Sequence, residues 1–475
     1  MFDNTTFQKL VAAEHSTGEV IGVDRFIVTA KGLNGVAVGA QVVFESGQRG
    51  IVREVGAETV LILNLEAENT KLGQLVVLQD NSFTTPVGEG LIGRVVDPLC
   101  RPLDSKGPIH LEATWPVYNR APGILERSIL KDQLPSGVTV VDTLFPVVLG
   151  QRIAVLGDTK SGKSTFLLQL GVNQTGTDRI VVYVLIGKRR VEIDRTISTL
   201  IETGAIKNSI VVVADIFDSL AQSYIAPYVG CSIAEHLWYN GHDVVIIYDD
   251  LSSHAKVYRE VSLLAEANPG RDSYPGDMFY AHSSLLERAG KLASNGKTLT
   301  ALPTVVTPSD DITAYLPTSI MSITDGQIIF DLSTFRQNVR PAVNVGLSVS
   351  RVGGRALNAR QKTITDVIFK KLAEYRQAAE FAHFGSDMAP ETKLALEFGK
   401  LINDAFHQTP AELYSLIEQE LLLSTVLASN AESRLNIPLL KKQIKDAAPS
   451  IQNDADIDAL IPQLLQAVIM GAATT

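Results

Sequence analysis

The chain has 475 residues, enough for about three domains of ordinary size. Its formal net charge of −10 disfavours a broad nucleic-acid-binding surface. Two cysteines, Cys100 and Cys231, provide neither a disulfide framework nor a zinc cluster and suit a reducing cytosol. We find no apolar run long enough to span a membrane and no signal or transit peptide, so we expect a cytosolic protein of bacterial type.

Short apolar runs separated by glycines fill the first part of the chain. Residues 19–23, 26–30, 50–55 and 59–63 are rich in β-branched side chains, with turn residues between them. This pattern predicts a small β-barrel or sandwich. Residues 86–146 contain many prolines and glycines but are less polar than a flexible linker, so we expect ordered connecting structure there.

The pattern then changes to alternating strands and helices. Residues 180–186, 209–214 and 244–248 are apolar without alternation, which is typical of parallel strands covered on both faces. Residues 191–201 and 219–239 are predicted helices between them. From about residue 359, glycine becomes rare and apolar residues recur at helical spacing, which predicts a helical bundle. We assign residues 1–85 to the β-barrel, 86–357 to a nucleotide-binding α/β domain and 358–475 to the bundle.

The strongest motif lies between the predicted strand 152–156 and a predicted helix near Phe166. It has two glycines separated by four residues, and the second glycine is followed by lysine and serine. Glycines let backbone N–H groups turn toward a phosphate, lysine adds positive charge, and the helix contributes its positive N-terminal end. We therefore predict that nucleotide phosphates are bound by Gly157, Asp158, Thr159, Lys160, Ser161, Gly162, Lys163, Ser164 and Thr165.

Two residues are predicted to hold Mg²⁺. The Ser164 hydroxyl is an oxygen ligand of the kind that this cation prefers. Asp249 ends the predicted strand 244–248, and the carboxyl ends of parallel strands lie beside the phosphate loop in this class of sheet. Asp249 is expected to contact the metal directly or through water. The alternative is that its carboxylate caps the next helix.

Three cations, Lys188, Arg189 and Arg190, follow the predicted strand 180–186. A residue that activates water for hydrolysis would be well placed here, but a protonated lysine cannot accept a proton. The residues alone leave two readings open: a basic turn at a helix start, or a nucleotide site without a catalytic base. Further along, Arg351 lies in a turn-prone stretch between serines and a glycine pair, from which an arginine could reach a phosphate.

Longer stretches around these motifs resemble the alpha subunits of the F-type ATP synthases. The resemblance runs in the same order from about residue 18 to residue 438. Its clearest stretches are residues 93–96, 248–252, 269–271, 274–277, 282–288, 299–303, 322–327 and 340–354.

The resemblance implies a multidomain chain with an N-terminal β-barrel, a central RecA-like P-loop α/β domain and a C-terminal α-helical bundle. It implies Mg²⁺ with ATP or ADP as the ligand, held without turnover. The implied partners are beta subunits in an alternating three-plus-three ring, a central gamma stalk and a peripheral stalk with its delta subunit. Membrane contact would come only through the complex, at the cytoplasmic face of the bacterial membrane, and no nucleic acid is implied.

Residue roles follow from the same resemblance. Arg351 matches the arginine that enters the neighbouring catalytic beta site, and Ser348 lies in the same motif. Phe335, Arg340 and Pro341 match positions that line the nucleotide pocket. Lys188 stands where catalytic beta subunits have glutamate and alpha subunits usually have glutamine.

The chain also departs from the family pattern. Lys160 adds a cation to the phosphate loop, residues 405–407 replace glutamines that usually lie beside the adenine, and the stretch before the barrel, which usually meets the peripheral stalk, is short. Three alternatives are weighed against the alpha subunit: a ring-shaped nucleic-acid translocase, a homohexameric secretion ATPase and a scaffold subunit that no longer binds nucleotide. The acidic composition argues against the translocase, Lys188 argues against the secretion ATPase, and the intact phosphate loop argues against the scaffold subunit.

Overall fold

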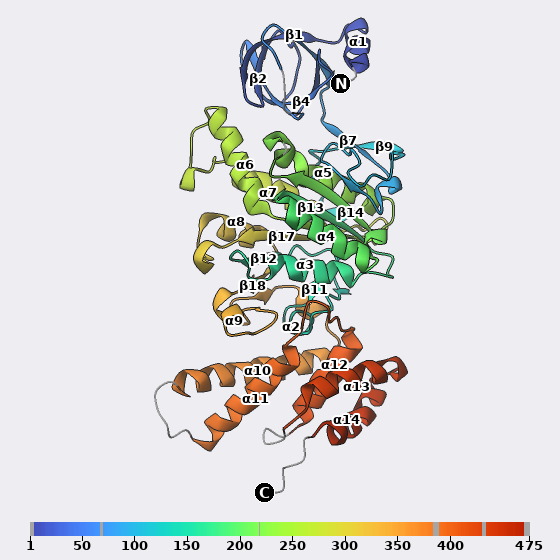
Figure 1. Ribbon diagram of the computed structural model, residues 1–475, viewed down its shortest axis with the longest axis vertical. Helices are drawn as coiled ribbons and strands as arrows, with labels where there is room; N and C mark the ends of the chain where they lie inside the picture. Colours follow the sequence, from blue (N-terminus) through green and yellow to red (C-terminus); the bar gives the residue numbers. More distant parts are fainter. Residues whose placement is uncertain (1–3, 67–69, 218, 383–388, 430–433, 470–475) are drawn as a thin grey trace.

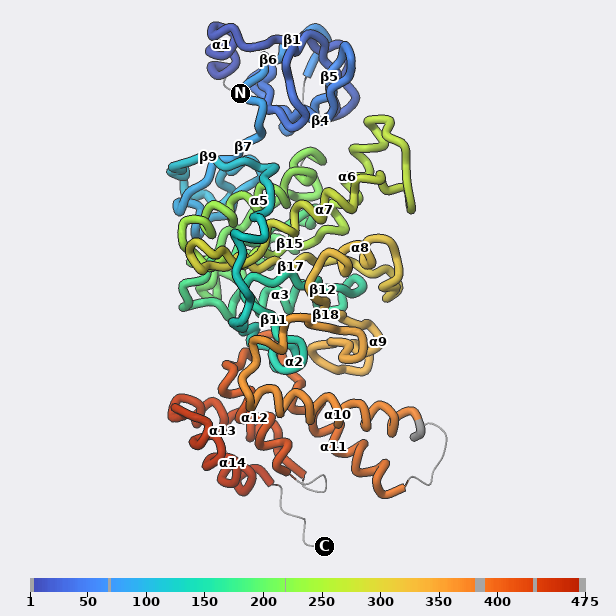
Figure 2. The backbone as a smooth tube through the Cα atoms, turned by 180° about the vertical axis from the view of Figure 1, so that it is seen from behind, coloured from blue at the N-terminus to red at the C-terminus, as the bar shows by residue number. Residues whose placement is uncertain are grey.

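The computed structural model describes residues 4–66, 70–217, 219–382, 389–429 and 434–469 as three stacked tiers (Figure 1). A β-barrel forms one end, an α/β domain the middle and a group of helices the other end. The view from behind shows the same stack, with the barrel and the helices on opposite sides of the middle tier (Figure 2). The predicted multidomain architecture is confirmed.

Six antiparallel strands close the barrel in the order β1-β2-β5-β4-β3-β6. Alternate side chains point inward, as a half-buried strand requires, and fill the interior with residues such as Val28, Phe44 and Ile62. A short helix, α1 (Thr5–Ala12), which we did not predict, packs Phe7 against the outside. The strands are β1 (Thr17–Asp24), β2 (Ile27–Lys31), β3 (Gln41–Phe44), β4 (Arg49–Val55), β5 (Thr59–Asn64) and β6 (Leu75–Asp80).

The proline- and glycine-rich stretch is ordered, as predicted. It forms the two-stranded pairs β7–β9 and β10–β11, adds β8 to the edge of the central sheet, and includes the buried helix α2 (Thr139–Leu144). Its short strands are β7 (Thr84–Val87), β8 (Val95–Val96), β9 (Ala113–Pro116), β10 (Gln133–Leu134) and β11 (Val147–Val148).

The central sheet has the order β19-β18-β12-β17-β15-β13-β14-β8 and is parallel from β18 to β8. β19 pairs antiparallel with β18 at one edge, and β16 pairs antiparallel with β17. The strands are β12 (Ala154–Gly157), β13 (Ile180–Lys188), β14 (Ser209–Asp215), β15 (Val244–Asp249), β16 (Gly290–Lys291), β17 (Thr298–Val306), β18 (Gly326–Phe330) and β19 (Val349–Ser350).

Helices cover both faces of this sheet, which explains why its inner strands are apolar without alternation. One face of β13, with Tyr183 and Leu185, packs in the core that contains α3 (Lys163–Val172) and α4 (Arg190–Glu202). The other face, with Val182 and Val184, packs in the core that contains α5 to α8. The remaining helices of this tier are α5 (Leu220–Tyr239), α6 (Leu251–Leu264), α7 (Met278–Leu286), α8 (Tyr315–Ile323) and α9 (Leu332–Arg336).

The third tier is helical, as predicted: α10 (Ala359–Ala382), α11 (Pro390–Phe406), α12 (Leu416–Ala428), α13 (Ile437–Ala447) and α14 (Asp454–Val468). Its apolar side chains belong to the same continuous core as the α3 and α4 face of the sheet. The opposite face shares its core with barrel residues such as Leu63 and Leu65. The sheet thus separates two cores, one continuous with the barrel and one with the helices. Within the described residues, no helix is both long and apolar enough to cross a membrane.

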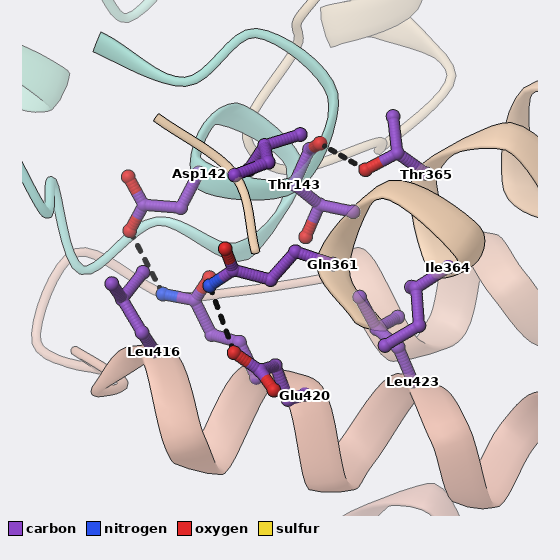
Figure 3. Close-up of a pocket in the computed structure, with 10 residues that line it drawn as sticks. Asp142, Thr143, Gln361, Ile364, Thr365, Leu416, Glu420 and Leu423 are labelled. Carbon is purple, nitrogen blue, oxygen red and sulfur yellow. Dashed lines mark hydrogen bonds between the residues drawn. The ribbon is translucent and has the colours of Figure 1, made fainter. Parts of the chain in front are cut away.

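Buried polar groups join the helical tier to α2 (Figure 3). The Asp142 carboxylate accepts hydrogen bonds from the backbone N–H of Ser136 at 2.8 Å and from Gln419 Nε2 of α12 at 2.8 Å. Thr365 of α10 donates to the Thr143 carbonyl at 2.8 Å. Burial nevertheless raises the pKa of Asp142 to about 6, against the lowering effect of these donors.

Candidate nucleotide-binding site

The phosphate loop connects β12 to α3 at the carboxyl end of the sheet, as its sequence predicts. Gly157 and Gly162 have φ values of +150° and +109°. A Cβ on Gly157 would lie 2.4 Å from the Phe330 carbonyl oxygen, so the loop needs a residue without a side chain there. Phe330 ends β18 and also packs its ring against Phe166 of α3, with ring centroids 5.6 Å apart.

Lys163 is the first residue of α3, and its side chain folds back along the loop. Its Nζ donates to the carbonyl oxygens of Gly157 and Asp158, both at 2.7 Å. Burial lowers the pKa of Lys163 to about 8, while the nearby carboxylates of Asp249 and Asp250 oppose this shift. The ammonium group is therefore held at the start of the loop, close to the positive end of α3.

A second set of hydrogen bonds holds the loop from the other side. The Asp158 carboxylate accepts from the Thr159 N–H at 2.6 Å and from the Ser309 N–H at 2.9 Å. The Thr307 N–H donates to the Gly157 carbonyl at 3.0 Å. Asp158 therefore fixes the loop to the turn after β17. Lys160 lies at the exposed tip of the loop with φ +65°.

Lys188, at the end of β13, forms an ion pair with the predicted metal ligand. Its Nζ lies 2.7 Å from Asp249 Oδ1 and 3.4 Å from Asp250 Oδ2. Burial would lower the pKa of Lys188, but the two carboxylates outweigh it and raise the pKa above its ordinary value. The side chain is consequently a fixed cation and cannot serve as a general base at neutral pH.

The helix-capping role that was the alternative for Asp249 belongs instead to its neighbour Asp250. Its Oδ1 accepts from the Ser253 N–H at 2.6 Å and so caps α6 (Leu251–Leu264). Asp249 ends β15, which pairs with β13 so that Leu185 lies beside Asp249. Neighbouring strands therefore bring Lys188 and Asp249 to the same edge of the sheet.

A cavity of about 440 Å³ opens beside the phosphate loop. Residues of α3, of α4, of the two strand ends and of the stretch before α12 line it: Ser164, Thr165, Leu168, Gln169, Val172, Leu185, Lys188, Glu192, Arg195, Thr196, Thr199, Thr203, Asp249, Pro410, Ala411 and Leu413. It therefore brings together the two predicted magnesium ligands and Lys188.

Only part of this donor set fits Mg²⁺. Ser164 is exposed and lines the cavity, but the Asp249 carboxylate beside it is already paired with Lys188. Among the described residues, no three or more His, Cys, Asp or Glu side chains are grouped to hold a metal ion. A magnesium ion at this site would depend mainly on Ser164, water and nucleotide phosphates.

Phe335 and Arg340 lie together on the segment after β18. The Arg340 guanidinium carbon is 3.5 Å from the centroid of the Phe335 ring, and Arg340 Nη1 donates to the Phe335 carbonyl at 2.6 Å. The Arg340 carbonyl accepts from the Gln408 N–H at 2.8 Å, and Pro341 follows directly. None of the three residues lines the cavity beside Ser164. Their predicted contact with nucleotide stays a prediction.

Arg351 and Ser348 have different surroundings, although they lie on one motif. Arg351 follows the edge strand β19 and is exposed, with Nη1 3.4 Å from the Thr324 carbonyl oxygen. Ser348 is buried, and its hydroxyl accepts from the Ile329 N–H at 2.9 Å. Arg351 therefore lies at the surface, whereas Ser348 positions β18.

Sequence reasoning missed two contacts at this site. The bond between Asp158 and Ser309 joins residues that are far apart in the chain, and no local pattern signals it. The ion pair between Lys188 and Asp249 had a usable signal, because Lys188 follows one predicted parallel strand and Asp249 ends another. Recognising it required the knowledge that these two strands are neighbours.

The fold and the loop define a P-loop nucleotide-binding protein with a barrel at one end and a helical domain at the other. Residues 137–350 match the model of the ATP synthase alpha/beta family, nucleotide-binding domain, and residues 360–465 match that of the ATP synthase alpha/beta chain, C terminal domain. The chain belongs to the ATP synthase alpha/beta family.

Curated relatives cover most of the chain. It is 41% identical to ATP synthase subunit alpha of Clostridium botulinum (strain Eklund 17B / Type B) over 414 residues, 86% of this chain and 82% of the relative. It is 38% identical to ATP synthase subunit alpha of Caldanaerobacter subterraneus subsp. tengcongensis over 466 residues, 95% and 92% of the two chains. It is 42% identical to that of Dictyoglomus thermophilum over 417 residues, 87% and 81%.

Proposed function

We propose that this chain is the alpha subunit of an ATP synthase head, binds ATP or ADP without turning it over, and lends Arg351 to a neighbouring catalytic site. The observation that carries the proposal is the ion pair of Lys188 with Asp249 and Asp250. It puts a fixed cation where a hydrolytic site needs a group that accepts a proton or orients water. The relatives named ATP synthase subunit alpha support the assignment.

The proposed assembly is the alternating ring of three alpha and three beta subunits around a gamma stalk, with a peripheral stalk and delta subunit attached. It would lie at the cytoplasmic face of a bacterial membrane and couple ATP synthesis or hydrolysis to ion transport. Mg²⁺ would enter with the nucleotide, held by Ser164 and the phosphates. Its chemistry would be to neutralise phosphate charge, while Lys163 and the loop N–H groups orient the phosphates.

The arginine role is tested by Arg351→Ala in the complex assembled with beta and gamma subunits. We expect ATP turnover to fall by about 10³-fold or more, because such arginines stabilise transition-state charge. ATP binding to the isolated variant chain, measured by calorimetry, should be unchanged. Arg355→Ala is the matched control, since Arg355 is also an exposed arginine close to β19. Equal turnover by the two variant complexes would refute the arginine role.

The non-catalytic role is tested on the purified chain alone. We expect it to bind ATP but to release no phosphate above background, because Lys188 cannot act as a base. Sustained hydrolysis by the isolated chain would refute this part of the proposal.

A further inference from the structure

The ion pair of Lys188 with Asp249 bears on how strongly nucleotide binding at this site depends on a divalent cation. In P-loop sites a divalent cation lies between the phosphates and an acidic residue at a strand end, so that two anionic groups do not face each other directly. Here Lys188 Nζ already lies 2.7 Å from Asp249 Oδ1. We propose that Lys188 takes over part of the charge-neutralising role of Mg²⁺, so that this site binds ATP or ADP with little dependence on a divalent cation.

Burial strengthens the charge neutralisation that Lys188 would provide in place of Mg²⁺. The side chains of Lys188, Asp249 and Asp250 are 15%, 11% and 11% exposed, so water and salt screen them weakly. Lys188 and Lys163 together balance the charges of Asp249 and Asp250. With an uncharged residue at position 188, the same group would carry one net negative charge and would repel the phosphates unless a divalent cation were bound.

The geometry of the carboxylates also makes the site a poor binding site for Mg²⁺. Lys188 occupies one oxygen of Asp249, and Asp250 is committed to the N-terminus of α6 through the Ser253 N–H. Mg²⁺ requires near-octahedral oxygen ligands and gives up its water reluctantly, so a carboxylate shared with an ammonium group is a poor partner. Ser164 and Lys188 line the same cavity, which brings the ammonium group to the face that a nucleotide would use.

This inference rests on the proposed nucleotide site, and one calorimetric experiment separates the two. The dissociation constant of ATP is measured for the full chain in excess Mg²⁺ and in excess EDTA. For the native sequence we expect the two constants to agree within about fivefold. For Lys188→Gln we expect the loss of affinity in EDTA to be at least about tenfold larger, because one buried positive charge is gone.

Two control variants define the outcome. Lys188→Arg keeps the charge and should keep the native ratio of the two constants. Arg190→Gln removes an exposed cation from the same helix start, where it pairs with Asp194, and should also keep that ratio. If Lys188 only supported the backbone, Lys188→Gln would weaken binding equally in both buffers and the ratio would not change, which would overturn the inference.

Mn²⁺ binding gives a second readout. Titration of the chain–ADP complex with Mn²⁺, followed by electron paramagnetic resonance, should show weak binding by the native chain and binding about tenfold tighter by Lys188→Gln. Loss of native ATP binding in EDTA to the level of Lys188→Gln would overturn the inference and leave the nucleotide site standing. Absence of ATP binding in both buffers would overturn the nucleotide site as well.

Discussion

Gly157 shows how a single residue determines whether the phosphate loop can form. It is the last residue of β12, and the Phe330 carbonyl occupies the space that a Cβ would need. Gly176 also has a positive φ, of +81°, but has no atom within 4 Å of an added Cβ. Comparing alanine variants at the two positions therefore distinguishes the effect of backbone strain from that of crowding.

We predict that Gly157→Ala lowers the free energy of unfolding by about 3 kcal/mol and abolishes ATP binding, because crowding adds to backbone strain. Gly176→Ala should cost about 1 kcal/mol, since it meets strain alone, and should leave ATP binding intact. Denaturant unfolding and calorimetric ATP titration measure both effects. Similar costs for the two variants would show that crowding at Phe330 is unimportant.

Individual residues also show where the sequence stops being informative. The residue types and spacing of the phosphate loop are required by phosphate chemistry, so the loop is recognisable from its sequence. The distance of 2.7 Å between Lys188 and Asp249 depends instead on the order of the strands and on side-chain rotamers, which the sequence does not reveal locally. Ser348 illustrates the same limit, because only the fold shows that its hydroxyl bonds to the Ile329 N–H.

At the level of elements, strands buried on both faces were the most predictable. The apolar runs 180–186, 209–214 and 244–248 became β13, β14 and β15, each longer by one or two residues. Their composition reflects burial on both faces, which is a local requirement. Helix α1 was missed, because its partners β3 and β6 lie far along the chain and its own pattern is short.

The junction between α2 and α12 carries a pH prediction. Burial raises the pKa of Asp142 to about 6, so the folded chain keeps this proton at pH values where the unfolded chain, with a pKa near 3.9, has lost it. The folded state then binds more protons between about pH 4 and pH 6, and stability attributable to Asp142 falls as pH rises through this window.

Comparison with Asp142→Asn isolates this effect, because the variant cannot titrate and retains Glu420 and all other groups. We predict that the unfolding free energy of the native chain, minus that of Asp142→Asn, decreases by about 2 kcal/mol from pH 4 to pH 6.5. Urea unfolding at half-unit steps measures it. A difference that stays flat, or rises with pH, would show that the donors from Ser136 and Gln419 outweigh burial.

For the whole molecule, the central sheet is a boundary between two cores. One core joins the barrel to the α5 face, and the other joins the helical tier to α3 and the phosphate loop. Ile368 of α10 and Leu63 of β5 are both fully buried, and they lie in the two cores on opposite faces of the sheet. They form a matched pair for testing how far a packing defect spreads.

We predict that Ile368→Ala and Leu63→Ala each lower the free energy of unfolding by about 2–5 kcal/mol. Native-state hydrogen exchange should differ: Ile368→Ala should speed exchange in α3 and leave β2 unchanged, whereas Leu63→Ala should do the reverse. Faster exchange in both places in either variant would contradict the separation of the cores.

The division has a mechanical consequence. A ligand that tightens the start of α3 stiffens side chains that are continuous with α10 and α12, while the barrel is anchored to the other side of the sheet. Nucleotide binding should therefore change the rigidity of the helical domain and leave the barrel unaffected. A partner bound to the barrel would contact a part of the molecule that does not respond to nucleotide. A partner bound to the helices would contact the part that does.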